Sequence, residues 1–70
     1  MHKVLSDISG SVWKVEVQPG QAVEAGQTLL VVESMKMEIP VESPAAGTVR
    51  ELRVAEGEAV SDGQWLVTLD

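Results

Sequence analysis

The sequence contains one motif written twice. Residues 10–29 align without gaps with residues 47–66. The identical positions are Gly10/Gly47, Val12/Val49, Val17/Val54, Gly20/Gly57, Ala22/Ala59, Val23/Val60, Gly26/Gly63, Gln27/Gln64 and Leu29/Leu66. These matches are mainly glycines, which permit special backbone conformations, and apolar residues, which fill cores. The duplication is therefore structural, and it predicts two copies of one folding unit related by a pseudo-two-fold axis.

Each copy is predicted to run as strand, turn, short strand, turn and closing strand, with the closing strands at 28–32 and 65–69. In the first long strand, Val12 is out of phase with Val15 and Val17. A β-bulge would place all three on one face. The same phase change recurs at Val49 in the second copy, so we expect a bulge in both.

The turns of each copy are marked by glycine. Residues 18–21 suit a type II turn, in which Pro19 presets φ and Gly20 takes a positive φ. The corresponding residues of the second copy, 55–58, also contain a glycine at this position, Gly57. Gly26 closes the second turn of the first copy, and Asp62-Gly63 in the second copy is a strong hairpin signal.

No segment shows a helical period, and the abundant valine favours strands. A lead-in strand near Val4 and a return strand at 38–42 bring the total to about eight short strands. In the return strand, Ile39 and Val41 share one face, and Glu38, Pro40 and Glu42 share the other. We therefore predict a single all-β domain over residues 1–70, a small sandwich or flattened barrel. The connection between the copies would project at one end, and the two termini would meet near the opposite end.

The composition of the chain excludes several classes of partner and of binding site. The net charge of −6 argues against nucleic acid and anionic membranes as partners. The absence of cysteine excludes disulfides and thiolate metal ligands. No signal peptide or transmembrane run is recognisable, so a cytoplasmic location is expected. We also expect a monomer in isolation. His2, the only imidazole, is expected at a mobile N-terminus, and no metal-ligand cluster or phosphate-binding loop is present.

The connection between the two copies is the exceptional stretch. It reads Glu33-Ser34-Met35-Lys36-Met37-Glu38 and joins two strand-like segments so closely that a tight hairpin is expected. Such hairpins normally turn on Gly or Asn, because their favoured turns need positive φ. Here neither is present, and a broken local rule is expected at a functional site.

Lys36, between two methionines at this tip, is the candidate functional residue. A catalytic lysine has to be uncharged, through burial or a nearby cation. Glu33, Glu38 and Glu42 favour the charged ammonium instead, so independent catalysis is not expected. The remaining chemistry is modification, with Lys36 as the point where another enzyme attaches a group.

A purely structural interpretation of the same residues stays open from composition. An exposed lysine at a turn commonly serves solubility. Met37 has the strand parity of Ile39 and Val41, so it could extend the core, with Met35 packing beside it. Trp13 and Trp65 are interpreted as core or rim packing rather than as a recognition platform.

The central stretch, followed by Ser43-Pro44-Ala45-Ala46-Gly47-Thr48-Val49, closely resembles the biotinyl-domain family, or biotin carboxyl carrier proteins. The resemblance covers essentially the whole chain, including both copies of the motif. It implies a flattened barrel of two four-stranded antiparallel sheets (a barrel-sandwich hybrid). It also implies that Lys36 is biotinylated by a biotin protein ligase, with Met35, Met37, Glu33, Ser34 and Glu38 recognised by the ligase or by partners.

The same resemblance implies a shuttle. Biotin on Lys36 would take a carboxyl group from bicarbonate at a biotin carboxylase and give it to an acceptor at a carboxyltransferase. The domain itself would have no catalytic residues and no metal. Two alternatives remain. A lipoyl carrier of the same fold would bear lipoate, although lipoyl domains usually have Asp before the lysine and Ala after it. An unmodified adaptor module would keep only the fold.

Overall fold

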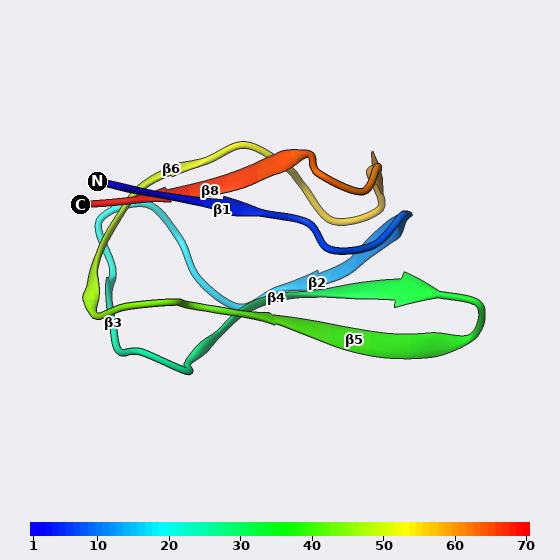
Figure 1. Ribbon diagram of the computed structural model, residues 1–70, viewed down its shortest axis with the longest axis horizontal. Helices are drawn as coiled ribbons and strands as arrows, with labels where there is room; N and C mark the ends of the chain where they lie inside the picture. The colour runs from blue at the N-terminus through cyan, green and yellow to red at the C-terminus, as the bar shows by residue number, and fades with distance from the viewer.

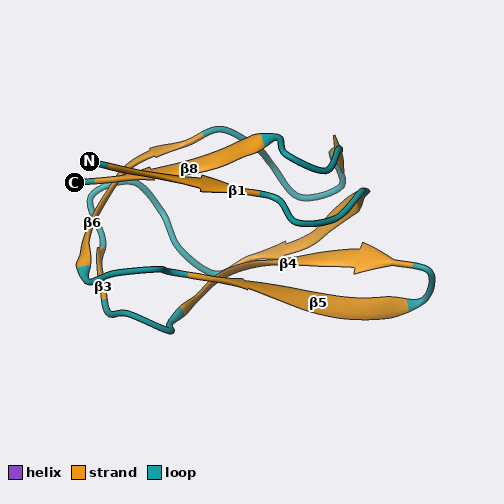
Figure 2. Cartoon of the chain, viewed as in Figure 1, coloured by secondary structure: helices purple, strands orange, loops and turns teal.

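The computed structural model describes all 70 residues and consists of strands joined by turns and loops (Figure 2). The strands are β1 (His2–Leu5), β2 (Gly10–Val15), β3 (Ala22–Val23), β4 (Thr28–Ser34), β5 (Met37–Glu42), β6 (Gly47–Leu52), β7 (Ala59–Val60) and β8 (Trp65–Leu69). The all-β prediction is confirmed, and both closing strands lie where the sequence predicts. The molecule has no helix long and apolar enough to cross a membrane.

The strands form two four-stranded antiparallel sheets that pack face to face (Figure 1). One sheet has the order β1-β8-β6-β3 and the other the order β5-β4-β2-β7. The two copies of the motif are therefore interlocked, because β3 of the first copy pairs with β6, and β7 of the second copy pairs with β2. The predicted double-sheet architecture is confirmed.

Pseudo-two-fold symmetry extends to individual hydrogen bonds. The Gly20 N–H donates to the Val49 carbonyl at 2.8 Å, and the Gly57 N–H donates to the Val12 carbonyl at 2.7 Å. The buried hydroxyls of Ser6 and Ser43 each donate to a carbonyl two residues ahead, both at 2.6 Å. Residues 37 positions apart thus play the same structural role in the two copies.

The predicted bulges are present in both copies. The register of β2 against β4 shifts between Val12 and Lys14, and the register of β6 against β8 shifts between Val49 and Glu51. The extra residue in the first bulge, Trp13, is 50% exposed. The bulge lets Val12 and Val15 both face the core, since an inserted residue restores the two-residue period.

The glycine turns have one common form. Gly20, Gly26, Gly57 and Gly63 all have φ between 84° and 91°. Each turn is closed by a backbone hydrogen bond, such as the one from Gln21 N–H to Gln18 O at 3.1 Å, as expected for a type II turn. The residue after each glycine is Gln or Glu, and its side-chain oxygen accepts from the first N–H of the turn. This second contact was not predicted from the sequence.

One turn prediction is wrong in part. Asp62-Gly63 forms a turn, but it does not join a hairpin, because β7 pairs with β2 whereas β8 pairs with β1 and β6. The chain changes sheets at this turn. The positive φ of 85° at Gly63 is needed for that change of direction rather than for strand pairing.

The core is built from valine and leucine alone. Its members are Val4, Val12, Val17, Val23, Leu29, Leu30, Val32, Val49, Val54, Val60, Leu66, Val67 and Leu69. Neither tryptophan belongs to it. Trp65 is partly buried, and its ring makes cation–π contacts with the Lys3 ammonium (4.4 Å from the centroid) and with the Arg53 guanidinium (4.1 Å). Both tryptophans therefore pack on the outside of the barrel.

The chain ends lie together, opposite the β4–β5 hairpin (Figure 1). His2 is paired with Leu69, so it begins β1 rather than lying in a mobile terminus as the sequence suggested. The relative position of the termini and the hairpin agrees with the symmetry prediction.

Candidate functional site

The tip of the β4–β5 hairpin is a two-residue turn. Ser34 pairs with Met37, which leaves Met35 and Lys36 as the loop. Their φ values are 50° and 65°, and they are the only non-glycine residues with positive φ. Two consecutive positive values define a type I′ turn, whose twist matches the flanking strands. Non-glycine residues in this conformation are strained, typically by about 1–3 kcal/mol each. The tight, glycine-free hairpin expected from the sequence is confirmed.

The side chains at the tip lie in solvent. Met35 is 92% exposed, Met37 is 64% exposed, and Lys36 is exposed as well. The hairpin projects beyond the rest of the barrel (Figure 1), so Met37 has no opposing sheet to pack against despite its inward parity. The interpretation of the two methionines as core packing is therefore wrong.

The Lys36 ammonium takes part in none of the ion pairs. These are Lys14–Glu16 at 3.6 Å, Arg50–Asp70 at 3.4 Å and Arg53–Glu51 at 3.2 Å. The amine therefore has no carboxylate partner within 4.0 Å.

Two glutamates flank the tip on the outer face. Glu33 pairs directly across the hairpin with Glu38, and both are exposed. Like charges at directly opposite positions destabilise a strand pair. The pair gives the tip a negative outer surface next to the lysine. Ser34 is only partly buried, one pair closer to the turn.

The base of the hairpin is held by a close backbone contact. A Cβ added to Gly10 would lie 2.3 Å from the carbonyl oxygen of Glu33. Glycine is therefore needed where the start of β2 lies against β4, just below the tip. Beneath this contact, Val32 is fully buried and pairs with the half-buried Ile39. The paired strands β2, β4 and β5 thus form a rigid support for the turn.

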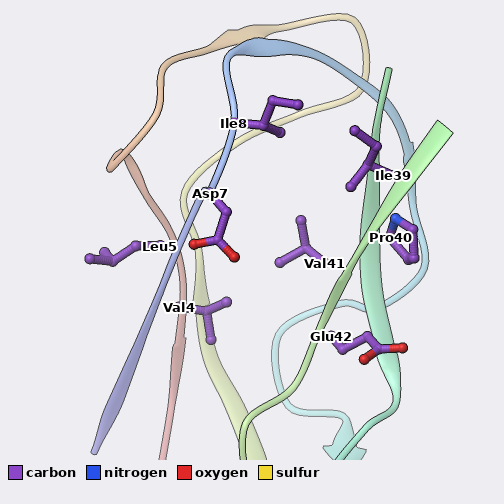
Figure 3. A pocket seen from close by; sticks show the side chains of 8 residues that line it. All are labelled: Val4, Leu5, Asp7, Ile8, Ile39, Pro40, Val41 and Glu42. Carbon is purple, nitrogen blue, oxygen red and sulfur yellow. The ribbon is translucent and has the colours of Figure 1, made fainter. Parts of the chain in front are cut away.

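The molecule offers no metal cluster and one groove. No group of three or more His, Cys, Asp or Glu side chains is placed to hold a metal ion. The groove, of about 290 Å³, lies between the edge strands β1 and β5 (Figure 3). It is lined by Val4, Leu5, Asp7 and Ile8 on one side and by residues 39–42 on the other. The groove was not predicted from the sequence, although the inward parity of Ile39 and Val41 on an edge strand was a usable signal.

Comparison with known proteins places the chain in a family. A biotin/lipoyl family model described as "Biotin-requiring enzyme" matches residues 4–69. The chain therefore belongs to the biotin/lipoyl attachment family. Within it, the chain is homologous to biotin carboxyl carrier protein, as the similarities below show.

The relatives include small proteins and much larger enzymes. The chain is 42% identical over 62 residues to the biotin/lipoyl attachment protein of Bacillus subtilis (strain 168), covering 89% of this chain and 85% of that protein. It is 42% identical over 66 residues to the biotin carboxyl carrier protein of acetyl-CoA carboxylase from Solanum lycopersicum, covering 94% of each. The crystal structure of Kluyveromyces lactis urea carboxylase contains a similar domain, with a TM-score of 0.93 and 28% identity. That match covers 99% of this chain but only 6% of the urea carboxylase chain.

Proposed function

We propose that this domain is a biotin carrier whose attachment point is Lys36. The observation that carries the proposal is the position of Lys36, an exposed amine in a strained type I′ turn of a family member. A turn that required only stability would use Asn or Gly at these positions. The strain at Met35 and Lys36 is accounted for if a second protein has to recognise them.

The geometry suits acylation of the amine. A biotin protein ligase would present biotinyl-adenylate, and the Lys36 Nζ would attack its acyl carbon. An amide bond forms, the acyl–phosphate bond breaks, AMP leaves, and the amine loses a proton. The projecting hairpin lets the amine reach an active site that the barrel cannot enter, and the rigid support fixes its position there.

The residues around Lys36 have separate roles in this proposal. The exposed thioethers of Met35 and Met37 would pack against the ligase or a carboxylase partner. Glu33 and Glu38, on the outer face, would meet basic groups on those partners, and Ser34 would set the register of the last strand pair. None of these residues is asked to perform chemistry, so the domain is a non-catalytic component.

Attached biotin supplies a ureido nitrogen that carries a carboxyl group. The domain contributes presentation, by holding the arm at one end of a compact body that docks at a biotin carboxylase and then at a carboxyltransferase. Tethering raises the local concentration of the carried group at both sites. In this proposal the carboxyltransferase partner sets the acceptor, in keeping with relatives named for acetyl-CoA and for urea.

Intact and peptide mass spectrometry after co-expression with a biotin ligase tests the proposal. We expect one biotinyl group, confined to Lys36. The chain contains only two other lysines, Lys3 and Lys14, so the assignment is unambiguous. Lys36→Arg should abolish incorporation and change the free energy of unfolding by less than about 0.5 kcal/mol, as for an exposed surface site. Lys14→Arg is the matched control and should be modified as the parent is.

Other outcomes would redirect the proposal. Modification by a lipoate ligase and not by a biotin ligase would assign the chain to acyl-transfer complexes. The absence of both modifications on a folded chain would favour an adaptor without a prosthetic group.

A further inference from the structure

The groove between β1 and β5 is not used by the attachment site, and one of its walls is the strand that begins next to the tip. β1 and β5 are edge strands of different sheets, related to each other by the pseudo-two-fold axis. Figure 3 shows Ile8 and Ile39 facing each other from the two walls at one end of the groove, and Val4 and Glu42 at the other. Ile39 lies three residues from Lys36, so the isoleucine end is the end nearer the tip.

We infer that the isoleucine end of this groove is a docking site for the bicyclic head of the biotinyl group on Lys36. The inference rests on the attachment function proposed above. It gives the arm a second position, folded back against its own domain, between visits to partner active sites.

The arm has the right reach. Along β5, the Cα of Ile39 is about 10 Å from that of Lys36, at ~3.3 Å per residue. The four lysine methylenes and the valeryl chain span on the order of 14 Å. The head can therefore reach Ile39, which Ile8 faces across the groove (Figure 3), whereas Glu42 is six residues from Lys36 and ~20 Å away along the strand, beyond the length of the arm.

The lining has the right chemistry for a small, mostly apolar head with polar N–H groups. Ile8 and Ile39 are each partly buried and present apolar surface to the groove. The Asp7 carboxylate lines the same groove, between Leu5 and Val41 in the view of Figure 3, and it can accept hydrogen bonds from ureido N–H groups. The groove as a whole, including its Val4–Glu42 end, has a volume of about 290 Å³, just below the roughly 300–1,000 Å³ of small-ligand pockets.

An extended peptide is a poorer occupant of the same groove. A peptide that joined the edge of β5 would need a continuous row of backbone donors and acceptors. Pro40, in the middle of β5, has no N–H, and Glu38 and Glu42 place charges beside it. Proline and charge are the usual means of protecting an edge strand from pairing. The groove is thus closed to strand addition and open to a compact ligand.

Isoleucine methyl NMR tests the inference directly. Ile8 and Ile39 are the only isoleucines in the chain, so selective δ1-methyl labelling gives two signals, one from each wall. The spectra of the unmodified and the biotinylated chain are compared, and mass spectrometry of each NMR sample verifies whether Lys36 carries biotin. Docking predicts that both signals shift and that the Ile8 methyl shows an NOE to the bicyclic ring protons.

Ile8 is the decisive reporter, because Ile39 is close enough to Lys36 to respond to acylation alone. Asp7→Ala should move the Ile8 signal of the biotinylated chain back toward its unmodified position. Glu42→Ala, which removes the groove carboxylate beyond reach of the arm, is the matched control and should leave the shift intact.

Two results would overturn the inference while leaving the attachment proposal standing. One is a biotinylated chain in which Ile8 neither shifts nor shows the NOE. The other is an Ile8 signal that depends on protein concentration rather than on biotin, which would assign the groove to a second copy of the chain. A chain that carries no biotin on Lys36 would instead remove the proposed function itself, and this inference with it.

Discussion

The two ends of the barrel have the same strand pairing, but one end closes in a hairpin turn and the other holds the chain termini. The dyad relates the β4–β5 hairpin to the β8–β1 pair, so that Leu30↔Val41 at one end corresponds to Val67↔Val4 at the other. At the first end, the chain crosses over through Met35 and Lys36. At the second, the counterparts of Glu33 and Glu38 are Asp70 and Met1, where the chain has its termini.

The local energetics of the two ends also differ. The tip combines two strained positive φ values with a directly opposed Glu33–Glu38 pair. At the terminal end, Asp70 is partly neutralised by Arg50 at 3.4 Å, and no residue has a strained φ. The same barrel is thus completed without strain where no modification is proposed. The strained tip is therefore not a requirement of the barrel itself, which supports the proposal that a second protein recognises these residues.

The largest expected difference between the two ends is in the free energy of unfolding lost when the glycine next to each end, Gly10 or Gly47, is substituted. A Cβ at Gly10 or at Gly47 would lie 2.3 Å from a carbonyl oxygen, of Glu33 in the first case and Asp70 in the second. Glu33 is held on both sides, by pairing with Ser11 and with Glu38, whereas the Asp70 backbone is hydrogen-bonded on one side only, to Thr48. We expect Gly10→Ala to lower the free energy of unfolding by about 3 kcal/mol and Gly47→Ala by about 1 kcal/mol, measured in urea. Equal losses would show that both ends are held equally firmly.

The glycine turns should respond equally in the two copies, in contrast to the ends. Around Gly20 and Gly57 there is open space, so a substitution is strained only through φ, at 91° and 87°. We expect Gly20→Val and Gly57→Val each to cost about 2 kcal/mol in thermal or urea unfolding. Gly57→Asn should recover much of the loss, because Asn tolerates positive φ. Parent-like melting of both valine variants would contradict the turn assignment.

Relaxing the tip should make the first end resemble an ordinary hairpin. Met35→Asn combined with Lys36→Gly gives the residue pair that a type I′ turn favours. We expect unfolding to become harder by about 1 kcal/mol, which is roughly 5 °C in Tm for a domain of this size. Differential scanning calorimetry measures it, with Lys36→Arg as the control that removes the acceptor without relieving strain. An unchanged Tm would mean that the positive φ values carry no strain.

The smallest expected effects are those of the surface charges. Glu33→Gln should stabilise the chain by about 0.3 kcal/mol, because it relieves a like-charge pair. Arg50→Ala should destabilise it by less than about 0.5 kcal/mol, since the Arg50 and Asp70 side chains are 61% and 57% exposed. Both changes should fade in 1 M salt, where charges are screened within about 3 Å. Effects of the same sign would contradict the electrostatic contrast between the ends.

Much of the fold could be predicted because it is encoded locally and twice. The phase change after Val12, repeated after Val49, identifies the bulges, and the alternation in residues 38–42 identifies the faces of β5. The tight tip followed from the short distance between two strand patterns. Local signals of this kind depend on sterics within a few residues, which the sequence displays directly.

What the sequence could not provide depends on contacts between distant residues. The exchange of β3 and β7 between copies is one example, since two-residue strands carry too little pattern to name their partners. The Asp62-Gly63 signal was misleading for the same reason, because the turn is local but the pairing is not. Met37 has the parity of a core residue, and only the length of the opposing sheet decides that it lies in solvent. The groove requires two edge strands from different sheets to be brought together.

The exchange of β3 and β7 has a consequence for how the domain comes apart. Because each copy of the motif completes a sheet of the other, neither copy is a structural unit that can open while its twin stays closed. Unfolding therefore has to involve both sheets at once, and partial unfolding of one copy gains little conformational entropy. A carrier domain that is bound and released at one end many times would stay folded by this means, because each copy of the motif holds the other in place.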